Sequence, residues 1–324
     1  MSENYQNLEK FTNKRYSGIL SAGFSFFGKN WLKLIIPFGI FLIIAIIVKD
    51  LIVVDLNWQN IILTQQVDII IAKDPSMITN DDLMTMLQYL SNLIVIGFLD
   101  SLIRTSLGVF SMCLFGSFIY KKFIGDSPKL SEELKTSFNP KLIGVLLLLG
   151  LGIPLGTFLI YIPSILIIGF YSFSIFTFNS KNINNSIKTA RNISRGSFWK
   201  VIGIFVISNL VIGSINVIYQ TLMNNFLTIP DSWYNPLSRN IGMIIVYDLL
   251  YNIIEIVLSP LFICLLCSLY VHLHVKTMEG PIYTDTSHLP KSDNKGFYCP
   301  FCGQYMNQLR QYCPNCGGKL NFEI

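Results

Sequence analysis

Apolar positions along this chain gather into runs of membrane length, and three of these runs directly follow a short amphipathic segment. A bilayer core of about 30 Å requires about 20 helical residues. The three pairs are residues 16–27 with 31–48, residues 130–138 with 142–161, and residues 183–195 with 198–218. This pattern predicts helix hairpins, each introduced by a short amphipathic helix on the membrane surface.

The other apolar stretches raise the number of predicted spans to about six. One begins after Thr79 or Asn80, where Asp81 and Asp82 suit the positive end of a helix, and it runs to Tyr120. The remaining two predicted spans are residues 163–178 and 241–275. The fold class expected is an all-α polytopic membrane protein with amphipathic helices at the cytoplasmic interface.

Basic residues mark the predicted cytoplasmic side. Residues 121–141 hold five lysines against three acids, and the stretch 181–200 has five basic residues and no acid. By contrast, residues 49–82 contain six aspartates against two lysines, and we expect them to form an outer loop. Six spans with both termini in the cytoplasm then satisfy the positive-inside rule, and a cleaved signal peptide is not expected.

Composition agrees with this class, since hydrophobic residues make up 52% of the 324 positions and charged residues 13%. The net charge of +5 is explained by membrane orientation and anionic lipid, so nucleic acid is not an expected partner. The first and third units also align without a gap, pairing Ile19 with Ile187, Ala22 with Ala190, Gly28 with Gly196 and Trp31 with Trp199. We therefore expect three similar hairpin units.

Two CPxCG motifs near the C-terminus predict a metal site. Four thiolates suit tetrahedral zinc, and the glycine after each pair permits the tight turn. The predicted ligands of one structural zinc ion are Cys299, Cys302, Cys313 and Cys316. The segment resembles the short zinc-ribbon domain of prokaryotic membrane and regulatory proteins.

The expected domains are a cytoplasmic tail at 1–15, a membrane domain at 16–276, a linker at 277–295 and the ribbon at 296–324. Cys264 and Cys267 lie in an apolar run and are expected to pack as small hydrophobes.

Four charged residues lie well inside apolar runs: Asp100, Arg104, Asp248 and Glu255. Asp100 and Arg104 are spaced to pair on one helix face. The cluster is either an ion-paired lock between two helices or a substrate or proton site. Tyr247–Asp248 and Gly97–Asp100 partly resemble the motifs of intramembrane aspartyl proteases, but their order is reversed and Leu99 replaces a glycine. No catalytic residues are assigned.

The stretch from Tyr161 through Phe178, followed by Ser186–Arg191 and Arg195–Lys200, resembles a recurrent multi-pass membrane domain that accompanies some glycerophosphodiester phosphodiesterases. The resemblance implies a similar helical layout over residues 16–275. The activity is not implied, because no cluster of His, Glu and Asp supplies the metal chemistry of the phosphodiesterase domain.

The sequence thus predicts a non-enzymatic protein of the cell membrane. Its cytoplasmic zinc ribbon is expected to contact a protein partner or the membrane surface, for protein interaction or regulation. The alternative is a transporter or channel-like component that uses the intramembrane charged cluster. Oligomeric state is left open by the sequence.

Overall fold

The computed structural model describes residues 15–159, 161–179, 185–278, 297–298 and 305–306. Apart from one pair of short strands, this part is helical, as predicted. Five helices are long and apolar enough to cross a membrane, namely Tyr16–Ile71, Asn80–Phe123, Lys141–Leu159, Phe198–Phe226 and Ile253–Leu273. They are typical of a multi-pass membrane protein. The predicted fourth span falls on shorter helices, discussed below.

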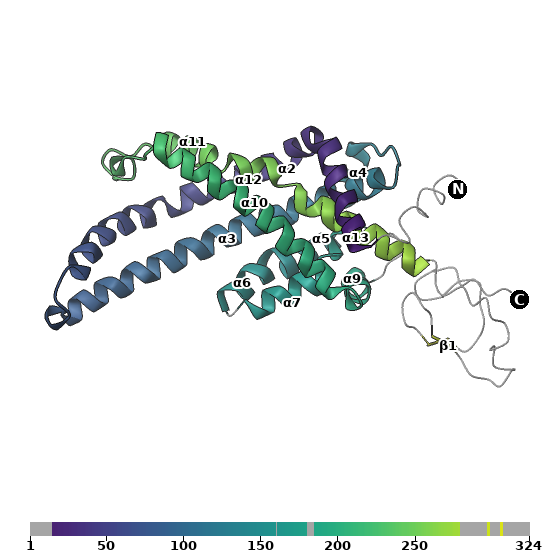
Figure 1. The fold of residues 1–324 in the computed structure, drawn as a ribbon, viewed down its shortest axis with the longest axis horizontal. Coiled ribbons are helices and arrows are strands. Elements are labelled where there is room, and N and C mark those ends of the chain that lie inside the picture. Colours follow the sequence, from purple (N-terminus) through teal and green to yellow (C-terminus); the bar gives the residue numbers. More distant parts are fainter. Residues whose placement is uncertain (1–14, 160, 180–184, 279–296, 299–304, 307–324) are drawn as a thin grey trace, which may run out of the picture.

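The first two long helices, α2 (Tyr16–Ile71) and α3 (Asn80–Phe123), form an antiparallel hairpin. They leave the bundle together as a two-helix arm that ends at the 3-10 turn η1 (Pro75–Met77) (Figure 1). The prediction of a loop over residues 49–82 is therefore wrong, because only residues 72–79 connect the helices. No glycine or proline interrupts residues 49–71, and the inward face of this stretch buries Val53, Leu63 and Val67.

The start of α3 agrees with the prediction from local sequence. The Thr79 hydroxyl accepts a hydrogen bond from the Asp82 backbone N–H at 3.2 Å, and the Asp82 carboxylate accepts one from the Thr79 N–H at 2.9 Å. This reciprocal capping box satisfies two backbone donors that the first helical turn leaves free. Pro75 in turn excludes the preceding residue from the helical conformation, which explains why α2 ends shortly before it.

The first and third units differ in local structure. In the third unit, α9 (Ser186–Arg195) ends at Gly196 before α10 (Phe198–Phe226) begins, as predicted. In the first unit, Gly28 lies inside the uninterrupted α2, so the expected separate helix over residues 16–27 is absent there. The two units also differ in the side-chain contacts made just after these glycines. The Phe198 ring packs closely over Gly169, which holds the break, whereas Asn30 at the aligned position donates a hydrogen bond to the Phe26 carbonyl within α2.

The third predicted span comprises α5 (Lys141–Val145), the π-helical turn η2 (Leu146–Leu151) and α6 (Gly152–Leu159). Pro154 has no N–H and its ring crowds the carbonyl four residues earlier, so the wider turn before it relieves the conflict. The chain then turns at Tyr161 into α7 (Ile162–Tyr171) and α8 (Ser174–Thr177). A Cβ at Gly156 would lie 2.6 Å from the Ser164 backbone nitrogen, so only glycine permits this close turn.

The sixth apolar stretch is broken into three helices, α11 (Ile241–Tyr251), α12 (Ile253–Leu258) and α13 (Leu261–Met278). The 3-10 turn η3 (Asp231–Trp233) precedes them. The prediction of one span over residues 241–275 is thus too simple, since the helix is interrupted at Asn252 and again before Leu261. Helix α13 forms the centre of the core. Cys264 and Cys267 are fully buried in it as free thiols, which confirms that they pack as small hydrophobes.

The short helix α4 (Leu130–Ser137) packs on the end of α3. Ser117 donates a hydrogen bond to the buried carboxylate of Glu133 at 2.6 Å, and Lys121 forms an ion pair with the same group. Burial alone would raise the pKa of Glu133, but these two partners outweigh it and hold the pKa below its ordinary value. The Glu133 carboxylate therefore attaches α4, which the sequence predicts as a surface helix, to the bundle.

Strands β1 (Phe297–Tyr298) and β2 (Tyr305–Met306) pair in antiparallel register, with Phe297 opposite Met306 and Tyr298 opposite Tyr305. The four predicted zinc ligands, Cys299, Cys302, Cys313 and Cys316, lie outside the described residues.

Candidate functional site

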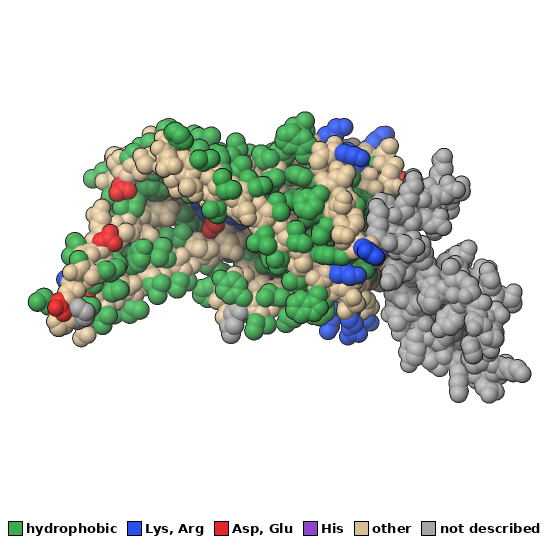
Figure 2. Space-filling model, viewed as in Figure 1, with side chains coloured by type: hydrophobic (Ala, Val, Ile, Leu, Met, Phe, Trp, Pro, Cys, Tyr) green, Lys and Arg blue, Asp and Glu red, His purple; other side chains and the backbone are tan. Residues whose placement is uncertain are grey.

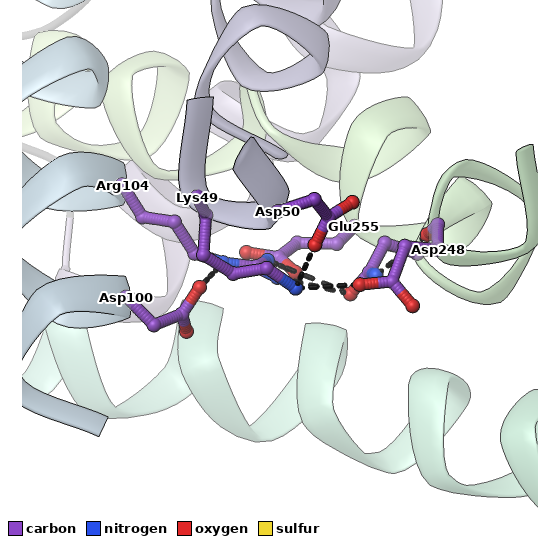
Figure 3. Close-up of polar contacts among 7 residues, drawn as sticks. Lys49, Asp50, Asp100, Arg104, Asp248 and Glu255 are labelled. Carbon is purple, nitrogen blue, oxygen red and sulfur yellow. Dashed lines mark hydrogen bonds and ion pairs between the residues drawn. The ribbon is translucent and has the colours of Figure 1, made fainter. Parts of the chain in front are cut away.

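Six charged side chains converge where the arm leaves the bundle. They come from α2, α3, α11 and α12, and they form two groups in which one base is shared by two acids (Figure 3). In the first group, which we call the Lys49 triad, the Lys49 Nζ lies 2.8 Å from Asp50 Oδ1 and 2.5 Å from Asp248 Oδ2. Residues at adjacent positions of a helix do not face each other, so it is the long lysine side chain that reaches between the two acids.

The second group, the Arg104 triad, joins α3 to α12. Arg104 Nε lies 2.7 Å from Asp100 Oδ1, one turn earlier on the same helix, and Arg104 Nη1 lies 2.5 Å from Glu255 Oε2. The guanidinium group presents several donors in a fixed plane, so a single arginine can bind two carboxylates at once. Asp100 and Glu255 are thereby linked through their common base.

Asn252 connects the two triads at the break between α11 and α12. Its Nδ2 donates a hydrogen bond to the Asp248 carbonyl at 2.7 Å, and its Oδ1 lies 3.5 Å from both terminal nitrogens of Arg104. The Asp248 carbonyl also accepts the backbone N–H of Asn252 at 3.0 Å, so the side-chain amide shares this acceptor with the backbone. The amide therefore lies between Arg104 and the backbone of Asp248.

The cluster holds more acid than base. Two bases, Lys49 and Arg104, face four acids, so full ionisation would give each triad one negative charge in excess. The two triads differ in burial. The side chains of Asp100 and Glu255 are 33% and 32% exposed, whereas Asp50 and Asp248 are 2% and 17% exposed. The protein therefore encloses the Lys49 triad more completely than the Arg104 triad.

Of the four sequence-predicted residues, Asp100, Arg104 and Glu255 lie together, and Asp248 lies in the neighbouring triad. Sequence reasoning missed Lys49 and Asp50, both of which it assigned to the start of the outer loop. The absence of glycine and proline between them and Ile71 was the signal that the helix continues.

The segment between α10 and α11 lies near the Lys49 triad. Arg239 Nη2 lies 2.5 Å from Asp55 Oδ1, which ties this segment to the arm. Burial raises the pKa of the Tyr234 phenol, and the negative charges of Asp248 and Asp50 raise it further. Tyr234 therefore lies within electrostatic reach of both acids and stays protonated at neutral pH.

The viewed face is hollowed between the arm and the helices above it, and acidic and basic side chains are visible on the floor of the hollow (Figure 2). The same view shows lysine and arginine side chains gathered at the end near α4 and α9, and acidic side chains on the arm. The molecule is thus electrically polarised along its length, with the hollow near the root of the arm.

Neither a metal site nor a protease dyad follows from this geometry. Among the residues that the structure describes, no group of three or more His, Cys, Asp or Glu side chains is arranged to hold a metal ion. Asp100 and Asp248 bind different bases, whereas an aspartyl protease needs two carboxyl groups that share a proton with each other.

Comparison of the chain with protein families, curated proteins and solved structures finds no match. The resemblance to the phosphodiesterase-associated membrane domain and to the zinc ribbon therefore stays a prediction from sequence.

Proposed function

We propose that this chain is a non-enzymatic multi-pass membrane protein that works as a carrier or channel-like component through its charged cluster. The observation that supports this proposal is the sharing of two bases by four acids across four helices. Sequence alone favoured docking through the zinc ribbon, but the geometry of the described residues favours the cluster.

The excess of acid is what distinguishes this cluster from a simple lock between helices. Charged groups in or near a bilayer core are costly, and a structural ion pair reduces that cost when base and acid are matched. Here each base is matched with two acids, so the arrangement keeps an unbalanced negative charge at the junction. A cation or a proton supplied from water would balance it, and exchange of that charge is the chemistry of ion-coupled transport.

Charge distribution supports the orientation. Basic side chains at the end near α4 and α9 favour the cytoplasmic leaflet, and the acidic arm then projects from the outer face (Figure 2). The cluster lies near the outer edge of the membrane core in this orientation. Both termini are then cytoplasmic.

The test is ion movement in proteoliposomes. Purified full-length protein is reconstituted, gradients of H⁺, Na⁺ or K⁺ are imposed, and trapped dyes report the flux. Wild-type protein is expected to conduct at least one of these cations, and Glu255→Gln is expected to reduce the flux at least tenfold at equal protein content. Glu132→Gln on α4 is the matched control, since its carboxylate is 68% exposed and far from the cluster in sequence. Absence of flux in the wild type, or equal flux in Glu255→Gln, contradicts the proposal.

A second candidate function is docking of a cytoplasmic protein through the zinc ribbon. The donor set of Cys299, Cys302, Cys313 and Cys316 fits a structural Zn²⁺, and the paired strands β1 and β2 come immediately before and shortly after the first CPxCG motif in the sequence. Zinc would supply the folding energy that so small a domain lacks.

Metal analysis and affinity purification test this second candidate together. One zinc per chain is expected in the wild type, and Cys299→Ser with Cys302→Ser is expected to lose both the metal and any bound partner. The pair Cys264→Ser and Cys267→Ser, in the buried core, is the control that should keep the metal. Zinc retained after loss of Cys299 and Cys302 contradicts the assigned ligands, while identical captured proteins contradict docking through the ribbon.

A further inference from the structure

Asp50 stands out within the charged cluster because one of its carboxyl oxygens has no partner. The residue is 2% exposed, and its Oδ1 contacts Lys49 at 2.8 Å. Its Oδ2 is buried and receives no hydrogen bond from the described part of the chain. A carboxylate uses both oxygens as acceptors, so an ionised Asp50 would keep an unsolvated, unpaired charge.

Lys49 cannot neutralise Asp50 fully, because it also binds Asp248. Lys49 Nζ is closer to Asp248 Oδ2, at 2.5 Å, than to Asp50 Oδ1. Asp248 is also the more exposed of the two acids, so water stabilises its charge more effectively. The ionic pair is therefore Lys49 with Asp248, and the excess negative charge of the triad falls on Asp50.

The groups around Asp50 offer no other compensation. Arg104 is occupied by its own two acids, and the Tyr234 phenol is uncharged. Lys49 on α2 contacts Asp50, Asp248 on α11 shares that lysine, and Tyr234 before α11 lies within electrostatic reach; the other charged and titratable groups of the junction are Tyr247 on α11, Asp100 and Arg104 on α3, and Glu255 on α12. Acids outnumber bases in this set.

A bound metal cation is the less suitable way to balance the charge. Hard cations require about six oxygen ligands in a shell around the ion. Within the described residues no group of side chains has that arrangement, and the Lys49 ammonium already occupies the space between the two carboxyl groups (Figure 3). A proton needs only one oxygen, and Asp50 Oδ2 is free to take it.

We propose that Asp50 is an exchangeable proton-binding site, with its Oδ2 protonated at neutral pH while Lys49 and Asp248 stay paired as ions. Proton release forms a carboxylate at Asp50, returns H⁺ to water in the hollow, and adds one negative charge beside Lys49. The ammonium group is then drawn from Asp248 toward Asp50, which loosens the link between α2 and α11. This inference deepens the proposed transport function by naming the proton and the residue that carries it.

Infrared spectroscopy of the full-length protein in lipid nanodiscs tests the site without any transport assay. A protonated carboxyl group has a C=O band distinct from that of a carboxylate, and exposed acids are ionised at neutral pH. We expect one exchangeable protonated-carboxyl band in the wild type, lost at higher pH and absent in Asp50→Asn. Asp55→Asn, on the same helix with a 72% exposed carboxylate, should keep the band.

Asp248→Asn provides a second variant in case Asp50→Asn does not fold. Without the Asp248 carboxylate, Lys49 pairs with Asp50 only and stabilises its ionised form. The protonated-carboxyl band should therefore titrate at a pH lower by about one unit or more. The proposal is overturned if the wild type has no protonated-carboxyl band at neutral pH, if Asp50→Asn keeps it, or if Na⁺ but not choline removes it. A band without flux of H⁺, Na⁺ or K⁺ in proteoliposomes would keep the site and contradict transport, so the two proposals fail separately.

Discussion

Lys49 and Asp248, 199 positions apart in the sequence, meet at 2.5 Å between α2 and α11. The contact fixes the root of the arm to the last part of the membrane domain. Lys49 forms ion pairs with two acids, so the removal of Lys49 should reduce stability more than the loss of one ordinary ion pair.

Substitution Lys49→Gln should destabilise the protein by about 3–5 kcal/mol at neutral pH, because it leaves the Asp248 carboxylate without its base in a poorly hydrated site. Adding Asp248→Asn to this variant should restore part of the loss, since the uncompensated carboxylate is then removed. Thermal unfolding in a mild detergent measures both. Equal stability of Lys49→Gln and wild type would mean that water already solvates this triad.

Gly23 permits the close approach of α2 to α13. A Cβ at this position would lie 2.8 Å from Leu265 Cδ2 and 2.9 Å from Leu265 Cα. Because backbone cannot move as a side chain does, Gly23→Ala should cost about 1–3 kcal/mol. Gly28→Ala is the control on the same helix, where a Cβ meets nothing within 4 Å and alanine should stabilise by about 0.5–1 kcal/mol. Two equal shifts in melting temperature would contradict this account of the packing.

Glu133 should give the protein an acid-sensitive contact between α4 and α3. Its pKa is lower in the folded state than its ordinary value of 4.5, so the folded state favours the ionised form. The stabilisation is therefore complete above about pH 4.5 and is lost as the pH falls through the lower folded-state pKa.

Unfolding of Glu133→Gln should accordingly show a weaker dependence on pH in this acid range than unfolding of the wild type. Glu132→Gln, a neighbouring change at a 68% exposed carboxylate, should leave the wild-type dependence intact. If the two variants gave the same acid profile, the Ser117 and Lys121 contacts would not control the stability of α4.

The orientation can be tested with single introduced cysteines at exposed positions on opposite ends of the molecule. Gln65 lies on the arm and Lys188 on α9, and both are exposed. A membrane-impermeant thiol reagent added to intact cells should label Gln65→Cys at once and Lys188→Cys only after permeabilisation. Ser186 is buried and would be a poor reporter. The opposite labelling order would invert the membrane orientation and place the arm in the cytoplasm.

Local sequence was sufficient where local chemistry decides the structure. Thr79 and Asp82 identify the start of α3, and Gly196 marks the end of α9. It failed at Lys49 and Asp50, which look like the polar end of a span. The absence of glycine and proline up to Ile71 indicates that the helix continues, but the pairing of Lys49 with Asp248 joins distant helices, and no local pattern contains that information.

The prediction of a helix break at Gly28 also failed because it relied on local sequence alone. Its alignment with Gly196 suggested a break, but the break at Gly196 depends on the contact of Phe198 with Gly169, and Asn30 replaces that phenylalanine. By contrast, the pairing of Asp100 with Arg104 follows from helical spacing on one element, and the structure has it at 2.7 Å. Side-chain partners on one helix are thus predictable, whereas those between helices require the fold.

The continuity of α2 through Lys49 has a mechanical consequence. From Lys49 to Ile71 the helix extends about 33 Å, and the same helix continues into the bundle on the other side of Lys49. The triad therefore lies at a fulcrum. A tilt of about 10° at Lys49 would move the arm tip by about 6 Å. A change of charge at Lys49 that tilts the arm would therefore produce a large displacement at its tip.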